Sequence, residues 1–193
     1  YRPELGYCAD TLHAPAGTSV RDERADDPLR PNPLIAVSLG VLTGEPARSV
    51  VRAVERHLLV PGALRSLAPL PVNYRLPVRG REDRLLNDPA HPYWGRYEGD
   101  EDTRRKPAYH NGTAWNWWLP TYCEALALAY GREARAVAAA RAVLGSSARL
   151  LGEGCLGQLP EIIDGDAPHS ERGCDAQAWS VTEALRVWLR LWS

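Results

Sequence analysis

The sequence predicts an all-α fold, organised as part of a layered array of helices. Three observations favour this class. Five segments have helical character, because their apolar residues recur three and four positions apart or the segment is apolar throughout. No segment shows the clear alternation of apolar and polar residues that marks a strand. The connections are alternately short and long, which is typical of an α/α toroid whose loops on one face carry a site.

The first two helices are expected in the first third of the chain. Residues 1–29 are polar and rich in turn formers, so we expect a loop with at most one short element. Residues 34–42 are apolar almost all round, as in a helix buried between neighbours, and Gly44 ends this segment. After Pro46 the apolar residues recur at helical spacing, which predicts an amphipathic helix that ends near Pro61.

The other three helices are expected after a long connection. Residues 61–112 are rich in Pro, Gly and aromatic residues, and a loop of this length in a compact domain is usually functional. A third helix is expected over 113–130, closed by Gly131 in the left-handed conformation, and a fourth over 133–151. The last helix carries an apolar stripe and a Glu183–Arg186 surface pair; the stripe comprises Ala178, Val181, Leu185, Trp188 and Trp192.

Length, charge and composition limit the possible partners. The 193 residues suit one domain with a real core, and the net charge of −1 provides no general attraction to nucleic acid. No apolar stretch approaches the roughly 20 residues that cross a bilayer, and no export signal is visible. The chain contains no Met and starts with Tyr1. We therefore expect residues 1–193 to be a single partial domain whose upstream portion belongs to the same parent protein.

The four cysteines give a prediction about compartment. They are widely spaced, form no CxxC pair and lie in a chain too long to need disulfides for stability. Reduced thiols in the cytoplasm are therefore expected. Cys155 and Cys174 flank one loop, so a disulfide between them stays an alternative.

The first candidate site is the segment YHNGTAWNWW at residues 109–118. Sugars present hydroxyl groups that bind planar amides and C–H faces that pack on aromatic rings, and this segment offers both partners. A structural role is the alternative: Trp117 and Trp118 would belong to the core, and Asn111 would cap a helix.

The second candidate site lies between residues 154 and 180. Glu161 stands between Pro160 and two isoleucines, a setting that removes water from a carboxylate and suits the acid–base chemistry of a glycosidase. The alternatives are that Glu161 accepts backbone hydrogen bonds and that Asp164 to Asp166 form an ordinary turn.

Other chemistries lack their motifs. Asp164, Asp166 and Glu171 miss the ligand positions of a calcium-binding loop. HExxH, GxxxxGK[ST] and GxSxG are all absent from the sequence. We therefore expect neither a metal nor a cofactor.

Four segments together resemble one family. LRPNPLIAVSL at 29–39, YHNGTAW at 109–115, EIIDGDAPH at 161–169 and GCDAQAWS at 173–180 resemble, in order, the amylo-α-1,6-glucosidase domain of glycogen debranching enzymes. The resemblance implies an (α/α)6 toroid of the six-hairpin glycosidase type. It also implies inverting hydrolysis of α-1,6-linked glucose at branch points of glycogen or a related α-glucan, with two carboxyl groups as acid and base.

The resemblance also implies site residues. Glu161 matches the general base, whereas the family's general acid is an Asp in a Trp-Met-Asp stretch, which this chain lacks and which we expect upstream. The residues implied to bind glucose are Tyr109, His110, Asn111, Trp115, Asp164, His169, Gln177 and Trp179, with Arg30 and Asn32 nearby or pinning their loop. The sequence departs from the pattern at Pro33, where Gln is expected, and at Asn116, where Pro is expected.

Three alternative functions remain open at this stage. A glucoamylase-like or trehalase-like glucosidase would use the same chemistry on another substrate. A glucan-binding fragment without catalysis would explain the missing acid. A sugar epimerase would place His110 and His169 around one site, because two imidazoles can move a proton without water entering the product.

Overall fold

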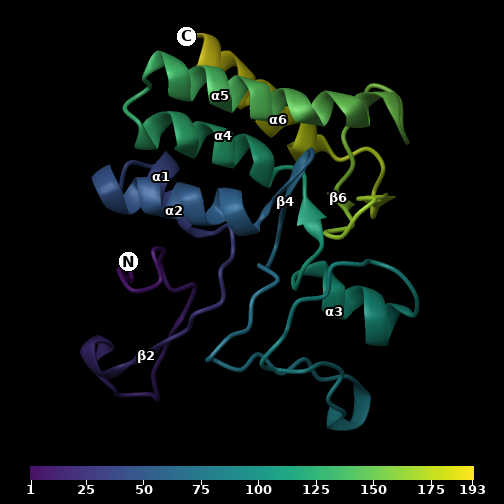
Figure 1. Cartoon of the computed structure of the whole chain (residues 1–193). Helices are drawn as coiled ribbons and strands as arrows, with labels where there is room; N and C mark the ends of the chain where they lie inside the picture. The colour runs from purple at the N-terminus through teal and green to yellow at the C-terminus, as the bar shows by residue number, and fades with distance from the viewer.

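Five main helices form three layers at one end of the molecule (Figure 1). The computed structural model describes residues 1–193, apart from the side chain of Val20. Helix α4 lies between the α1–α2 pair and the α5–α6 pair, and it contacts all four. The helices are α1 (Pro33–Ser38), α2 (Gly44–His57), α4 (Trp118–Ala129), α5 (Ala134–Gly145) and α6 (Ala178–Trp192), with a short α3 (Lys106–Tyr109) below them.

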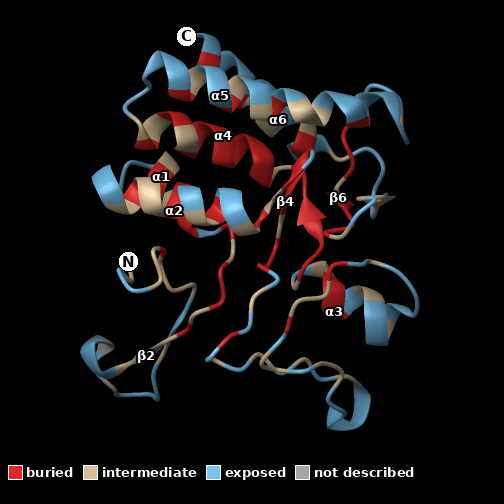
Figure 2. Ribbon diagram, viewed as in Figure 1, coloured by how far each residue is buried: buried red, intermediate tan, exposed pale blue. Residues whose placement is uncertain are grey.

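Helix α4 forms the centre of the core. Most of its residues are buried, as Figure 2 shows, because the segment is apolar on every face. Its one charged residue, Glu124, is buried and accepts hydrogen bonds from Nη2 of Arg186 at 2.9 Å and Nη1 of Arg190 at 2.6 Å. A third bond comes from Nη1 of Arg186 to Oε1 at 3.1 Å. These bonds give the buried carboxylate its partners, so its burial costs less free energy.

The expected all-α class is wrong, because the chain also forms two antiparallel sheets. The larger sheet has the order β3-β4-β5-β6-β7, and a separate pair, β1-β2, lies near the N-terminus. Therefore the chain is not a piece of an all-helical toroid. The strands of the larger sheet are β3 (Leu59–Val60), β4 (Ala63–Arg65), β5 (Ala114–Trp115), β6 (Ile162–Ile163) and β7 (Glu171–Arg172); those of the pair are β1 (Leu12–His13) and β2 (Arg24–Ala25).

The strands were not predicted from the sequence, because each has only two or three residues. Alternation needs four or more residues to show, so these strands carry no pattern of their own. The third helix was expected over 113–130 but begins at Trp118, since Ala114 and Trp115 pair with β4 and β6 in the middle of the sheet. Gly131 follows this helix with φ of +63°, which confirms the predicted left-handed residue.

The other predicted helices are present with changed ends. The first stops at Ser38, short of the expected residue 42, and the second begins at Gly44. The expected helix over 133–151 is α5 followed by a 3-10 turn, η4 (Ser146–Gly152). Residues 61–112 hold little regular structure besides β4, η2 (Arg81–Asp83), the π-helical η3 (Glu101–Arg105) and α3; η1 (Val20–Asp22) lies upstream.

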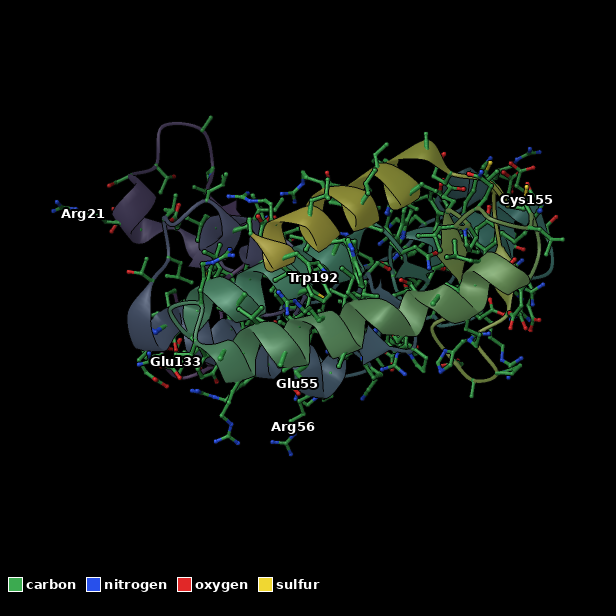
Figure 3. The ribbon with its side chains drawn as sticks, turned by 90° about the horizontal axis from the view of Figure 1, so that it is seen from above. Arg21, Glu55, Arg56, Glu133, Cys155 and Trp192 are labelled. Atoms are coloured by element: carbon green, nitrogen blue, oxygen red, sulfur yellow. The ribbon has the colours of Figure 1, made fainter. Side chains whose placement is uncertain are left out.

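Helix α6 turns its predicted apolar stripe largely toward solvent. Leu185, Trp188 and Trp192 are exposed, whereas Val187 and Leu191 on the neighbouring face are buried. Figure 3 shows α5 and α6 side by side, with Trp192 at the end of α6. The guanidinium of Arg141 on α5 lies 3.8 Å from the Trp192 ring. The predicted pair is confirmed, with Nε of Arg186 3.1 Å from Oε1 of Glu183.

Two further findings concern the chain as a whole. None of the described helices is both long and apolar enough to cross a membrane. All four cysteines carry free thiols, and Cys123 is buried on α4.

Candidate functional site

Glu161 occupies the position immediately before β6, where backbone and side-chain bonds fix it. Its N–H donates to the carbonyl of Cys174 at 2.8 Å, and its own carbonyl accepts from the N–H of Asn116 at 3.4 Å. Oε1 accepts a hydrogen bond from the hydroxyl of Tyr109, and Oε2 accepts one from the N–H of Cys174 at 3.2 Å. These two hydrogen bonds hold the carboxylate in place. Glu161 is half-buried, so part of it is still exposed to solvent.

Gly173 makes room for this carboxylate. Its φ is +68°, a conformation that glycine adopts without the strain other residues would feel. A Cβ atom at this position would lie 2.5 Å from Oε2 of Glu161. Both the backbone conformation and the closeness of Glu161 therefore require glycine at this position. The sequence analysis did not single out Gly173.

Tyr109 connects Glu161 with an aromatic cluster. It ends α3, and its carbonyl accepts a hydrogen bond from the indole Nε1 of Trp115 at 2.9 Å. The two rings meet edge to face with centroids 4.6 Å apart. Burial raises the pKa of the Tyr109 phenol, and its bond to Glu161 raises it further. Therefore the phenol stays protonated at neutral pH and serves as a donor to the carboxylate.

Four further rings continue from Tyr109 along one side of the site. His110 stacks on Trp115 with an interplanar angle of 7°, and Trp179 from α6 contacts both Trp115, at 5.9 Å, and Trp117, at 5.2 Å between centroids. These rings, with Trp118, Arg30, Pro31, Asn32 and Ser66, line an open pocket of about 340 Å³. The pocket is lined by aromatic faces with polar groups among them, as expected of a sugar site.

The electrostatic setting keeps His110 neutral. Loss of hydration lowers the pKa of its imidazole, the positive charge of Arg30 lowers it further, and Glu161 acts in the opposite direction. The side chain is still exposed to solvent at the pocket. A neutral imidazole has one donor and one acceptor nitrogen, so it suits a hydroxyl ligand.

Arg30 and Asn32 pin the loops around the pocket. The guanidinium of Arg30 donates to the carbonyl of Ser66 at 3.1 Å, to the carbonyl of His110 and to Oδ1 of Asn111 at 3.0 Å. Asn32 donates from Nδ2 to Oδ1 of Asp10 at 2.5 Å. Both residues also line the pocket. These contacts favour the structural interpretation of Arg30 that the sequence left open.

Asn111 also has structural partners. Its Oδ1 accepts from Arg30, and its Nδ2 donates to the carbonyl of Pro107 at 2.8 Å. It caps no part of α4, which begins seven residues later at Trp118. Asn111 therefore ties α3 to the loop of Arg30.

Asp164 and His169 do not line the pocket and form a separate structural cluster. Asp164 is 1% exposed, its Oδ1 accepts from the N–H of Tyr97 at 2.8 Å, and its Oδ2 accepts two bonds from Arg172 at 3.0 and 2.9 Å. This pairing raises the pKa of the Arg172 guanidinium. Nδ1 of His169 lies 3.0 Å from the carbonyl of Asp164. The contacts of Asp164 are those of a structural group, since its oxygens are already occupied.

The last predicted residues lie where α6 begins. Gln177 is the residue before α6, and its N–H donates to the carbonyl of Leu159 at 2.9 Å. Trp179 is 44% exposed and presents its ring to the pocket. The structure thus brings five of the predicted residues to one pocket: His110, Trp115, Trp179, Arg30 and Asn32. Tyr109 contacts the pocket residue Trp115 and links it to Glu161.

Two contributors were missed by the sequence analysis. Ser66 lines the pocket and accepts at Oγ from the N–H of Gly112 at 3.0 Å, and no local pattern around it signals this role. Tyr97 packs 5.5 Å from Tyr109 between ring centroids. It belongs to the aromatic residues of the long loop, which was a usable signal.

A comparison with known families assigns the chain to one of them. A family model described as amylo-alpha-1,6-glucosidase matches residues 13–186. The chain belongs to the amylo-alpha-1,6-glucosidase family. This confirms the resemblance that the four sequence segments indicated. A search of curated proteins found no match to the chain.

Membership of this family indicates a carbohydrate substrate. A glycosidase-like domain acts on a carbohydrate, and the pocket beside Glu161 offers aromatic rings and hydrogen-bonding groups for one. Within the described residues, no three His, Cys, Asp or Glu side chains gather as metal ligands would. His110 and His169 contact different partners, which gives no support to a two-histidine epimerase site.

Proposed function

We propose that the protein hydrolyses α-1,6-linked glucose at the branch points of an α-glucan, with Glu161 as the general base. The observation that carries the proposal is the carboxylate of Glu161 held by Tyr109 and Cys174 beside the aromatic pocket. Membership of the amylo-alpha-1,6-glucosidase family supports the substrate class.

In the proposed mechanism, Glu161 activates a water molecule. The carboxylate takes a proton from water while the water oxygen forms a bond to the anomeric carbon and the glycosidic carbon–oxygen bond breaks. A general acid gives its proton to the leaving oxygen. Attack from the opposite face inverts the configuration, so an α-link yields β-glucose.

The hydrogen bonds from Tyr109 and Cys174 would aim the carboxylate. Each oxygen accepts one of these bonds, so each still has a lone pair to accept a proton or bind water. Holding a base within hydrogen-bond reach of its water accelerates proton transfer, since little orientation entropy is then lost on reaching the transition state.

The pocket would hold the branch glucose. Trp179 is 44% exposed and offers a ring face for the C–H patches of the sugar, while His110 and Asn32 offer polar groups for its hydroxyls.

A second function, glucan binding without hydrolysis, is supported by one observation. The chain contains no Met, so it lacks the Trp-Met-Asp stretch in which the family resemblance places the general acid. Inverting hydrolysis needs a second carboxyl group roughly 6.5–9.5 Å away, and we assign the acid to no residue of this chain.

NMR of released glucose distinguishes the two functions. A protein that includes residues 1–193 is incubated with a branched limit dextrin, and the anomeric proton signals are followed. We expect β-glucose first, with Glu161→Gln abolishing its release while dextrin line broadening persists. Release of α-glucose first, or turnover by Glu161→Gln, would reject the proposed mechanism. Line broadening without release in the unmodified protein would favour binding alone.

A further inference from the structure

The carboxylate of Asp10 contacts two residues of the aromatic pocket, Arg30 and Asn32, without lining the pocket itself. Its Oδ1 accepts a hydrogen bond from Nδ2 of Asn32 at 2.5 Å. Its Oδ2 lies 3.7 Å from Nε of Arg30, which is within the range of an ion pair. One carboxylate therefore engages both polar side chains that the segment 30–32 contributes to the pocket.

A buried neighbour, Asp26, fixes the backbone of Asp10. Asp26 is 5% exposed, and its Oδ1 accepts hydrogen bonds from the N–H of Asp10 at 2.8 Å and the N–H of Thr11 at 3.0 Å. In the opposite direction, the N–H of Asp26 donates to the carbonyl of Thr11 at 3.1 Å. The Asp10 carboxylate is therefore in place before a ligand arrives, which reduces the entropy lost when the ligand binds.

Asp10 determines how the amide of Asn32 is oriented. An ionised carboxylate only accepts hydrogen bonds, so it binds the NH₂ end of the amide. Asn32 is exposed, and its Oδ1 accepts no hydrogen bond from another described residue. This oxygen is therefore free to accept a hydrogen bond from a sugar hydroxyl in the pocket.

Asp10 also offsets the charge of Arg30. Among the described residues that line the pocket, Arg30 alone carries a full charge, because His110 stays neutral. Loss of hydration lowers the pKa of the Arg30 guanidinium, whereas the charges of Asp10 and Asp26 raise it. The side chains of Arg30 and Asp10 are 18% and 17% exposed, so salt screens their attraction less than that of an exposed pair. The pocket therefore offers hydrogen-bonding groups with little net charge, which suits an uncharged ligand.

We propose that Asp10 orients Asn32 toward a sugar hydroxyl and, by offsetting the charge of Arg30, makes the aromatic pocket select uncharged sugars over anionic ones. Asp10 is a positioning and specificity-determining residue, because it acts on the ligand through Arg30 and Asn32. This inference rests on the proposed function for one point, that the ligand of the pocket is glucose.

NMR titration with glucose and glucuronate tests the selection. Glucuronate is glucose with a carboxylate in place of the C6 hydroxymethyl group. We expect the unmodified protein to bind glucuronate about tenfold more weakly than glucose. Asp10→Asn keeps the size of the side chain and removes its charge, so this preference for glucose should shrink about fivefold. The matched control Asp83→Asn removes a carboxylate that pairs with Arg79 outside the pocket, and it should leave the preference unchanged.

A second variant, Asp10→Ala, tests the orientation of Asn32. It removes the acceptor of the Asn32 amide, so glucose affinity should fall about fivefold. For a branched dextrin, KM should rise by a similar factor while kcat stays nearly unchanged, because Asp10 touches no reacting atom. Circular dichroism checks that the variant folds, and Asp10→Asn decides the matter if it does not.

The binding measurements need no turnover, so they separate this inference from the proposed hydrolysis. An unchanged preference in Asp10→Asn, the same change in Asp83→Asn, or an unchanged glucose affinity in a folded Asp10→Ala would overturn the role of Asp10, whatever Glu161→Gln does to turnover. A lack of glucose binding to the unmodified protein would overturn it as well.

Discussion

The hydroxyl of Tyr109 donates a hydrogen bond to Oε1 of Glu161 across 52 positions of sequence. Tyr109 comes from the end of α3 and Glu161 from the edge of β6, so neither local segment creates the pair. The contact links the carboxylate to the aromatic cluster through Trp115. The first two predictions concern how this carboxylate is held.

Removing the Tyr109 hydroxyl tests its positioning role. Tyr109→Phe keeps the ring contacts with Trp115 but loses the bond to Glu161, so the carboxylate gains freedom. We expect kcat for glucose release from a branched dextrin to fall about 10- to 100-fold, with KM nearly unchanged. The control Tyr130→Phe, at the end of α4, should behave as the unmodified protein does. Equal kcat values in both variants would show that Glu161 needs no help from Tyr109.

Adding one methyl group at Gly173 tests the space around Glu161. Gly173→Ala would place Cβ against Oε2, whereas Gly157→Ala has a similar positive φ and nothing within 4 Å. Both should cost about 1 kcal/mol of unfolding free energy through φ alone. Only Gly173→Ala should also lose turnover, by about 100-fold, since it displaces the carboxylate. Chemical denaturation and kinetics measure the two effects, and equal turnover in the pair would contradict the account.

The pKa of the His110 imidazole should depend on the charges around it. Its pKa lies below the ordinary 6.5 because of lost hydration and Arg30, while Glu161 raises it. Glu161→Gln should therefore lower the pKa of His110 further. NMR titration of the ring measures the change in the pKa of His110. A rise in this pKa would mean that the charge of Glu161 does not stabilise the protonated imidazole.

The same shift has a consequence for stability. Because the pKa of His110 is lower in the folded protein, the unfolded chain binds more protons between the folded value and about 6.5. The unfolding free energy should fall as the pH falls through that window, and His110→Gln should reduce this fall. The effect should be small, since His110 is exposed.

The hydrogen bonds of Asp164 should contribute to the free energy of unfolding. Asp164→Ala leaves the N–H of Tyr97 and the guanidinium of Arg172 without their carboxylate, and we expect a loss of about 3 kcal/mol of unfolding free energy. The control is Glu55→Ala, an exposed residue on α2 (Figure 3), which should change it by less than about 0.5 kcal/mol. A loss as small as that of the control would remove Asp164 from the structural cluster.

Helices with strong local signals were predictable from sequence. The valines of α2 recur at helical spacing, and Gly131 ends the α4 segment with a conformation that glycine favours. The error at residues 113–117 has a different origin. Ala114 and Trp115 are apolar enough for either a helix or a strand, and their pairing with β4 and β6 decided the matter.

The candidate site was predictable in part for a similar reason. Glu161, Tyr109 and Trp179 lie in segments whose residue types and order indicated glucan chemistry. Asp164 and Asn111 lie in the same segments, yet the structure gives their polar atoms to Arg172, Tyr97, Arg30 and Pro107. Side-chain type shows what a residue can bind, and only the fold shows which partner reaches it.

By itself, the sequence determined the family, the main helices and the segments that carry the sugar-binding groups, because these depend on local periodicity and residue type. The tertiary structure decided the five-stranded sheet, the Tyr109–Glu161 pair and the aromatic pocket. Each of these joins positions far apart in the chain, through backbone pairs two residues long or through single side chains. Such contacts leave no repeating pattern along the sequence, and they form only when packing around α4 brings the segments together.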